Sequence, residues 1–473
     1  MDPSRIPASF GPMGIEAMNY LNPNAAFYFD HCLYSAGHAN LDLTKPDPSE
    51  DMFRNRDRST SWVLGDSGGF QIGKGVWEGD WKNPNCPKAQ KKRELVLAWM
   101  DAYMDYGMIL DIPAWVCRSP EGRKASGITS YMEAVEGTYI NNDYFMKHRT
   151  GACKFLNVLQ GRTHKQSDDW YAEMKKYCDP NQYPDTHFNG WAFGGQNKID
   201  VHLMLRRLVD IIHDGLLVEG KHDLIHCLGT SILEYAVLFT DIQRAIRKYH
   251  NPKLQITFDC ASPFFSAAKG LAYFNTSIEH NKKWSYSMEK TAEKKSYAND
   301  TRKFSDAVLA EGIHKVFTDS PVTDKLLLKD LCYRGQGFIG QHGKETKTSW
   351  DTLSYTLLQS HNVWMHMNAV QEANRKYEQG VMPKMVMNRF DDEHFGEIVD
   401  KIFAQNDRQK SLDMIESHSS FWMQMKSGSQ GFSGKKAMNA MTMFDQLFEV
   451  NNNEPEVDEV IEDSDDAMSE ILG

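Results

Sequence analysis

The stretch DLIHCLGTSILEYAVLFTDIQRAIRKYHNPKLQITFDCAS (223–262) contains two short apolar runs separated by a longer amphipathic segment. The two runs predict β-strands, and the segment between them, 231–250, predicts a helix. A strand–helix–strand unit of this kind predicts parallel strands joined by a crossover. The same alternation extends toward the N-terminus, with predicted strands at 61–70, 106–113, 154–161 and 188–195 and predicted helices at 90–105, 129–148, 166–178 and 199–214.

These six predicted strands are almost continuously apolar, which is typical of parallel strands covered on both faces. No GxGxxG motif follows the first strand, and no GxxxxGK[ST] motif occurs in the chain, so neither nucleotide-binding signature favours a doubly wound sheet. We therefore expect an α/β fold, a TIM-like (β/α)8 barrel over residues 1–350. The remaining barrel elements and a polar insertion are expected within 264–350.

Two further regions are expected after the barrel. Residues 351–450 predict a helical C-terminal extension, which begins with a helix over 351–378 whose apolar residues recur every three to four positions. Residues 451–473 carry nine acidic side chains and no Lys or Arg, so we expect a disordered acidic tail. Without the nine negative charges of the tail, the net charge of −11 falls to −2 for the rest of the chain. A nearly neutral body can still present a basic groove to nucleic acid.

The sequence also predicts where the protein works. Its apolar runs are too short to span a membrane, and its N-terminus lacks the pattern of a secretory signal. The eight cysteines are scattered and form no CxxC pair, which favours free thiols in a reducing compartment. A cytoplasmic protein is expected, in the host cytoplasm if the gene belongs to a phage.

The predicted strands end in residues with chemical capability. In a (β/α) barrel the carboxyl ends of all the strands meet at one face, where the active site is assembled. Strand ends are also where any chain returns to solvent, so a single polar residue there is weak evidence. The whole set favours a site: Asp66, Asp111, Gln160, Gly194, Gly195, Gly229 and Asp259.

A basic segment, NKKWSYSMEKTAEKKSYANDTRK (281–303), follows the predicted site strands. Its lysines alternate with aromatic residues, a pattern that suits phosphate contacts combined with base stacking. A solvated surface with internal ion pairs is an equally good interpretation. The candidate nucleic-acid contacts are Lys282, Lys283, Trp284, Lys294 and Lys295.

Several motifs, in order, resemble those of the queuine/archaeosine tRNA-guanine transglycosylases over roughly residues 28–378. GDSGGFQ (65–71) resembles the run that lines the guanine pocket of that family, and FDCASP (258–263) resembles its nucleophile strand. The other matching motifs are LQG (159–161), GWAFGG (190–195), HCLGTS (226–231) and the helix LLQSHNVWMHMNAVQEA (357–373).

The resemblance implies a base exchange through a covalent sugar–enzyme intermediate. It implies Asp259 as the nucleophile and Asp66 as an acid/base. It also implies that Asp111 reads the guanine edge, whose N1–H and N2–H₂ groups a carboxylate can accept. The other implied base-binding positions are Ser67, Gly68, Phe70, Gln160, Gly194, Gly195 and Leu228, with Phe70 and Leu228 on the two faces of the base.

The chain departs from the tRNA enzymes at their structural zinc. The matching stretch KDLCYRGQGFIGQHG (329–343) retains only Cys332, and His361 falls at the position of the family's histidine. One Cys and one His do not make a tetrahedral site. His314 or His342 could complete a zinc site, but we expect no metal and no other cofactor, with Cys332 and His361 as packing residues. This departure makes the chain more similar to the phage-type transglycosylases that place 7-deazaguanines in DNA.

The predicted function is therefore replacement of guanine in DNA by a free 7-deazaguanine base, of the 7-cyano-7-deazaguanine type. Two alternatives stay open: the same reaction on tRNA, and a non-catalytic nucleic-acid-binding subunit with the same fold. No membrane partner is expected, and a homodimer is left open.

Overall fold

The computed structural model describes residues 7–45, 50–118, 120–291, 297, 299–310, 312, 317–332 and 352–430. Its centre is a seven-stranded parallel sheet in which each strand lies beside the next in chain order. The strands are β1 (His31–Ser35), β2 (Trp62–Asp66), β3 (Tyr106–Met108), β4 (Lys154–Leu159), β5 (Gly190–Phe193), β6 (Leu224–Cys227) and β7 (Gln255–Phe258). All six strands predicted from the sequence are confirmed in order and position, and β1 adds a seventh.

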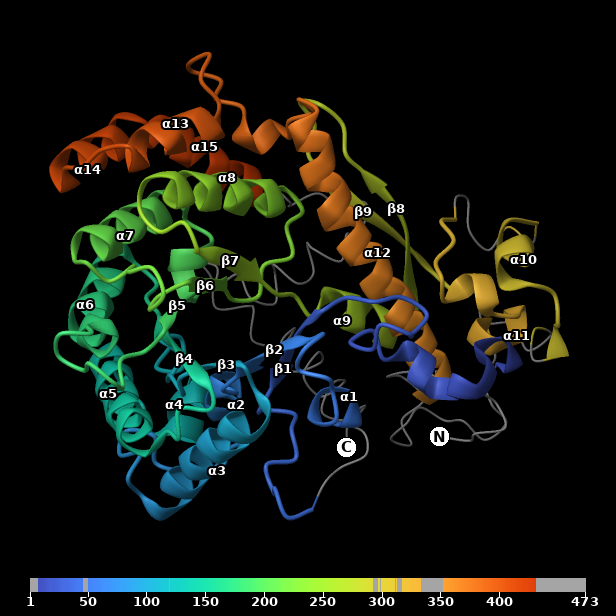
Figure 1. The fold of residues 1–473 in the computed structure, drawn as a ribbon, viewed down its shortest axis with the longest axis horizontal. Coiled ribbons are helices and arrows are strands. Elements are labelled where there is room, and N and C mark those ends of the chain that lie inside the picture. The colour runs from blue at the N-terminus through green and yellow to red at the C-terminus, as the bar shows by residue number, and fades with distance from the viewer. Residues whose placement is uncertain are drawn as a thin grey trace.

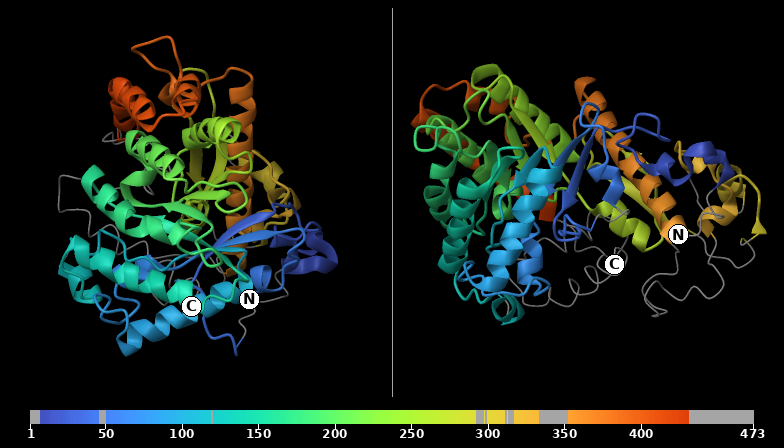
Figure 2. Two further views of the ribbon diagram at one scale, coloured as in Figure 1. Left: turned by 60° about the vertical axis from the view of Figure 1, so that its left-hand side comes forward. Right: turned by 60° about the horizontal axis from the view of Figure 1, so that its bottom comes forward.

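Helices alternate with the strands and lie on the outer face of the sheet, which curls so that they form an arc around it (Figures 1 and 2). The larger ones are α3 (Pro87–Tyr103), α5 (Tyr131–His148), α6 (His164–Met174), α7 (Val201–His213) and α8 (Glu234–Tyr249). Each overlaps a predicted helix. Short helices fill the connections: α1 (Asp51–Arg54), α2 (Gly69–Gly73), α4 (Pro120–Ser126) and α9 (Ser262–Ala268). The curled α/β architecture is TIM-like.

The predicted closure of the barrel is not seen. Among the described residues no eighth strand joins β7 to β1, and the part of 264–350 expected to supply it forms other elements. Strands β8 (Leu271–Ser277) and β9 (Ser285–Lys290) pair antiparallel in a sheet of their own. They are followed by α10 (Phe304–Ala310) and α11 (Leu328–Cys332).

The reason lies in α12 (Thr352–Glu378), which packs along β8 (Figure 1). Asn362 accepts a hydrogen bond from the Tyr273 N–H at 2.9 Å and donates to the carbonyls of Leu271 at 2.9 Å and Pro263 at 3.1 Å. His361, 1% exposed, contacts the Tyr273 carbonyl through Nε2 at 2.7 Å. A helix therefore satisfies backbone groups of β8 that a barrel strand would offer to its neighbours.

The C-terminal helices share the hydrophobic core of the parallel sheet. Helix α13 (Phe395–Phe403) packs on α8, and both α14 (Arg408–Ser417) and α15 (Ser419–Gln430) pack on α7. Their buried apolar side chains join the same cluster as those of the sheet. Most of residues 352–430 is helical, as expected for the predicted extension, and the predicted acidic tail lies outside the described residues.

None of the described helices combines the length and the apolar character that crossing a membrane requires.

Replacing Asn362 with Ala is expected to lower the free energy of unfolding by about 3 kcal/mol, because three buried backbone groups lose their partner. Urea unfolding measures the loss. The control is Asn368→Ala on the same helix, where an exposed side chain makes one local bond to Trp364 and the cost should stay below about 0.5 kcal/mol. Equal losses in the two variants would show that Asn362 does not hold β8.

Candidate active site at the carboxyl ends of the strands

Asp66 is the last residue of β2 and pairs in register with Ser35 at the end of β1. The Ser35 hydroxyl donates to Asp66 Oδ2 at 2.6 Å. Burial raises the pKa of the Asp66 carboxyl, and this outweighs the lowering by the Ser35 hydrogen bond, while the charge of Asp259 raises the pKa further. Asp66 therefore keeps its proton to a higher pH than an ordinary aspartic acid, and it lies within electrostatic reach of Asp259.

Asp259 directly follows β7 and has the opposite character. Burial alone would raise its pKa, but the hydrogen bond and charge of His226, the Gly229 N–H and the charge of Lys198 together hold the pKa below its ordinary value. Asp259 Oδ1 lies 3.1 Å from His226 Nε2 and accepts from the Gly229 N–H at 2.6 Å. The side chain keeps 24% of its surface exposed, so an ionised carboxylate is open to an incoming molecule.

His226 was not among the residues singled out from the sequence. It lies in β6, is 2% exposed, and pairs in register with Thr257 of β7, whose hydroxyl is 2.9 Å from its Nδ1. An ionised carboxylate can only accept hydrogen bonds, so His226 Nε2 donates to Asp259. The available signal was a histidine inside an apolar strand next to the strand that ends in the predicted nucleophile.

Asp111 and Gln160 form the second pair of the site. Gln160 Nε2 donates to Asp111 Oδ2 at 2.9 Å, and the two residues are only 8% and 6% exposed, respectively. Burial raises the pKa of Asp111 to about 7, against the lowering by Gln160, and the charge of Asp66 adds to the rise. The three predicted carboxylates are therefore electrostatically coupled along the strand ends, with Asp66 between the other two.

Glycine is required beside Gln160. A Cβ on Gly194 would lie 2.8 Å from Gln160 Nε2, and one on Gly195, where φ is +55°, would lie 2.5 Å from the Gly161 carbonyl. A side chain at 194 would therefore displace the Gln160 amide, and one at 195 would meet main chain in a conformation that favours glycine. These two glycines therefore bring the backbone after β5 directly against the amide of Gln160, as the prediction of a base-binding position requires.

The remaining predicted base-binding residues lie around the turn after β2. The Ser67 hydroxyl is buried without a hydrogen-bond partner, and Gly68 adopts a φ of +75°. The ring of Phe70 lies 5.4 Å from that of Trp115, centroid to centroid. Leu228 is partly buried just after β6. The arrangement of a base between Phe70 and Leu228 stays a prediction.

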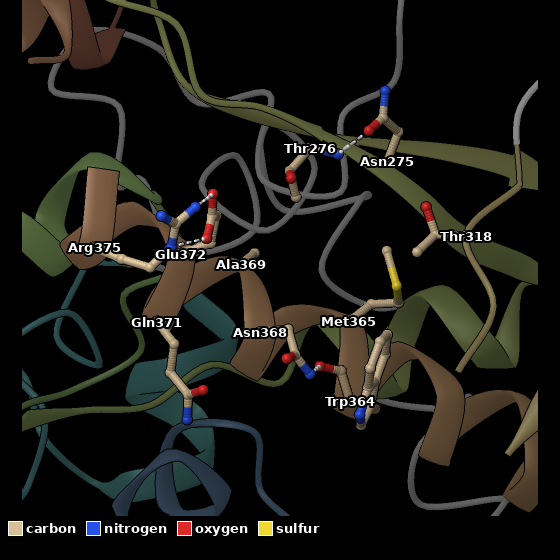
Figure 3. Close-up of a pocket in the computed structure, with 10 residues that line it drawn as sticks. All are labelled: Asn275, Thr276, Thr318, Trp364, Met365, Asn368, Ala369, Gln371, Glu372 and Arg375. Carbon is tan, nitrogen blue, oxygen red and sulfur yellow. Dashed lines mark hydrogen bonds and ion pairs between the residues drawn. The ribbon is translucent and has the colours of Figure 1, made fainter. Parts of the chain in front are cut away.

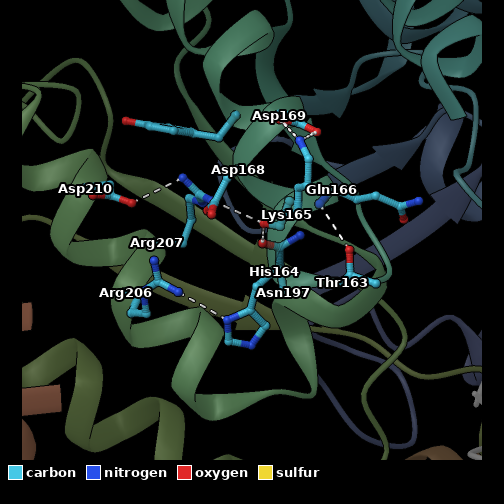
Figure 4. A network of polar contacts seen from close by, with 12 residues as sticks. Thr163, His164, Lys165, Gln166, Asp168, Asp169, Asn197, Arg206, Arg207 and Asp210 are labelled. Atoms are coloured by element: carbon cyan, nitrogen blue, oxygen red, sulfur yellow. Dashed lines mark hydrogen bonds and ion pairs between the residues drawn. The ribbon is translucent and has the colours of Figure 1, made fainter. Parts of the chain in front are cut away.

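A buried polar network that includes Asn197 and Arg207 (Figure 4) bonds to the main chain of Gln160 and Gly194. Asn197 donates to the carbonyls of Gln160 at 3.1 Å and Gly194 at 3.3 Å, and its own oxygen accepts from Ser167 at 2.6 Å. Arg207, 2% exposed, donates to Ser167 and pairs with Asp168 and Asp210. Side chains of α6 and α7 are thereby joined to Asn197, which holds the main chain of Gln160 and Gly194 in place.

The predicted nucleic-acid contacts need a correction. Trp284 is fully buried, and its indole N–H donates to the Glu279 carbonyl at 3.0 Å, so it has no face on which a base could stack. Lys282 is exposed and Lys283 is half-buried. Lys294 and Lys295 lie outside the described residues. The aromatic residue that suggested stacking is part of the core, and its backbone N–H donates to Glu234 Oε1 at the start of α8 at 3.0 Å.

The predicted histidine at the zinc position is structural. His361 is 1% exposed, with Nδ1 2.9 Å from the Ser320 hydroxyl and Nε2 on the Tyr273 carbonyl. Within the described ranges no cluster of three or more His, Cys, Asp or Glu side chains could hold a metal ion. His314 and His342 lie outside those ranges.

A separate hollow lies on the surface between β8 and α12 (Figure 3). An ion pair between Arg375 and Glu372, three residues apart on α12, lies along its wall. None of the predicted site residues lines it; the lining residues are Asn275, Thr276, Thr318, Trp364, Met365, Asn368, Ala369, Gln371, Glu372 and Arg375.

A scan against protein-family models finds none that matches this chain, and a search of curated proteins finds no match either. Membership of the transglycosylase family stays a prediction.

Asp111→Asn is expected to stabilise the protein at pH 8 and to have little effect at pH 4. The pKa of Asp111 is about 7 in the folded protein and has its ordinary value near 4 when unfolded, so the unfolded state loses its proton first as the pH rises. As the pH rises from about 4 to about 7, the Asp111 carboxyl therefore lowers the free energy of unfolding by on the order of 3–4 kcal/mol. Urea unfolding at both pH values measures the difference.

The control is Asp169→Asn on α6, which removes a carboxylate that is 40% exposed and paired with Lys165. It should show no comparable gain at pH 8. A gain for Asp111→Asn that is the same at pH 4 and pH 8 would contradict the assignment of a buried, proton-binding carboxyl.

Proposed function

We propose that this protein replaces a guanine base in DNA with a free 7-deazaguanine, through a covalent bond between Asp259 and C1′ of the sugar. The observation that carries the proposal is the opposed pair at the strand ends: His226 and the Gly229 N–H hold the pKa of Asp259 below its ordinary value, whereas burial and the charge of Asp259 raise the pKa of Asp66. Two carboxyl groups whose pKa values are pushed apart suit a nucleophile and an acid.

In the first step Asp259 Oδ attacks C1′ of the target nucleotide, and the bond from C1′ to guanine N9 breaks. The electron pair of that bond stays with guanine, which takes up the proton of Asp66 and leaves as the neutral base. The transition state carries positive charge on the sugar, which the Asp259 carboxylate stabilises before it forms the ester, as in retaining glycosidases.

In the second step the incoming 7-deazaguanine gives its N9 proton to the Asp66 carboxylate. N9 then attacks C1′ and expels Asp259, which regains its negative charge. Two inversions at C1′ restore the original configuration, and Asp66 ends with the proton it started with. The exchange therefore consumes no external energy source, and the target nucleotide must leave its stack to reach the site.

Base recognition falls to Asp111, Gln160 and the glycines beside it. Ionised Asp111 can accept the N1–H and N2–H₂ donors that guanine and 7-deazaguanine share. The Gln160 amide and the close main chain at Gly194 and Gly195 offer donors to O6. The buried, unpartnered hydroxyl of Ser67 is a further donor at the end of β2. DNA is preferred over tRNA on the strength of the sequence resemblance.

Trapping the intermediate tests the proposal. The protein is incubated with guanine-containing duplex DNA, and separately with tRNA, together with 7-cyano-7-deazaguanine, and an adduct that survives denaturation is sought. We expect an adduct with DNA that Asp259→Asn abolishes and Asp400→Asn, a surface substitution on α13, leaves unchanged. An adduct with tRNA alone would favour the tRNA reaction, and no adduct with either would favour a binding subunit.

His226→Leu is expected to move the acidic limb of the pH–rate profile upward by about 1–2 pH units, because Asp259 loses the donor and charge that offset its burial. His226→Gln, which can still donate to Asp259, should return most of the way to the wild-type profile. A lower rate with an unmoved acidic limb in His226→Leu would show that His226 does not set the ionisation of Asp259.

A further inference from the structure

Arg162 occupies an unusual position at the end of β4. It follows Gln160 by two residues and directly precedes Thr163, whose hydroxyl caps the N-terminus of α6. Its backbone N–H donates to Gln166 at 3.1 Å, but the Nε of its guanidinium is buried and has no hydrogen-bond partner. No carboxylate of the described chain forms an ion pair with this guanidinium.

A second arginine, Arg118, adds its positive charge to the surroundings of Arg162. Arg118 lies in the turn after Trp115, and its side chain is exposed. Burial and then the positive charge of Arg118 lower the pKa of Arg162 to about 10. Arg123 anchors the same turn by donating to the carbonyls of Cys117 at 3.0 Å and Arg118 at 2.9 Å. The positive charges of the two arginines thus repel one another, and no carboxylate in the described ranges pairs with Arg118 either.

Like charges at close range destabilise a fold unless something offsets them, and a structural role would call for acidic partners here. A phosphodiester is the ligand that this arrangement fits. A guanidinium offers a planar fork of donors that matches two phosphate oxygens, and the first turn of α6 adds the positive end of its dipole. The buried Arg162 Nε is a donor that such a ligand would satisfy.

We propose that Arg118 and Arg162 bind a phosphodiester of the DNA strand beside the nucleotide whose base enters the site. The proposal rests on the proposed function for its geometry, because Arg162 lies two residues from Gln160 and the backbone of the flipped nucleotide must pass this rim. The proposed contact with the DNA strand thus lies at the carboxyl ends of the strands, rather than in the predicted segment around Trp284.

The test measures non-covalent binding in the full chain carrying Asp259→Asn. Fluorescence anisotropy follows a labelled guanine-containing DNA duplex and, separately, a labelled tRNA at several salt concentrations. Arg118→Ala and Arg162→Ala are each expected to weaken DNA binding about 5- to 10-fold and to reduce the slope of log affinity against log salt by about one. The control Arg389→Ala removes an equal charge from the C-terminal extension and should change affinity less than about two-fold.

Thermal unfolding separates a binding role from a structural one. Because the two arginines repel and have no acidic partner among the described residues, their removal should leave the midpoint unchanged or raise it. If the double variant Arg118→Ala, Arg162→Ala binds DNA as tightly as the control, the proposal is wrong. It is also wrong if the double variant loses tRNA binding but keeps its DNA binding. If DNA binding depends on the two arginines but the chain with Asp259 intact exchanges no base, the phosphate site is supported and the proposed reaction is refuted. If the double variant with Asp259 intact exchanges bases at the wild-type KM, the reaction is supported and the phosphate site is refuted.

Discussion

The hydrogen bonds from His226 and the Gly229 N–H to Asp259 are the interactions on which the site depends. Burial alone would raise the pKa of this carboxyl and so disfavour the ionised form that the proposed attack requires. The parallel register of β6 and β7 supplies both donors, since it sets His226 beside Thr257 and brings the loop after β6 over the end of β7. The ionisation of the proposed nucleophile therefore depends on two adjacent strands rather than on one residue.

The same principle extends across the sheet. Ser35 reaches Asp66 because β1 and β2 are in register, and Gln160 reaches Asp111 from the strand next to it. Behind them the Asn197 and Arg207 network holds the main chain of β4 and β5 in place. The costs of this arrangement are concentrated at the site, where a carboxyl is buried with a pKa of about 7 and two arginines repel one another. Proteins commonly tolerate such costs where chemistry is performed.

Much of the fold could be predicted because parallel strands, covered on both faces, leave long apolar runs at regular spacing. Convergence of Asp66, Asp111 and Asp259 followed from the strand ends alone. The eighth strand could not be judged this way, because Leu271–Ser277 reads as a strand whether it joins a barrel or pairs with β9 beneath α12. Trp284 was misassigned because alternating aromatic and basic residues describe a strand with one buried face as well as a stacking surface. His226 was missed because its role depends on a neighbour 33 residues away.

The proposed reaction is tested most directly by comparing the amount of guanine released with the amount of new base incorporated. Duplex DNA is incubated with the protein and isotopically labelled 7-cyano-7-deazaguanine, then digested to nucleosides, and the released guanine, the incorporated label and the anomeric configuration are measured. We expect one guanine released for each labelled base incorporated, all with the original β configuration, and none with Asp259→Asn. Guanine release without incorporation, or incorporation that persists in Asp259→Asn, would contradict it.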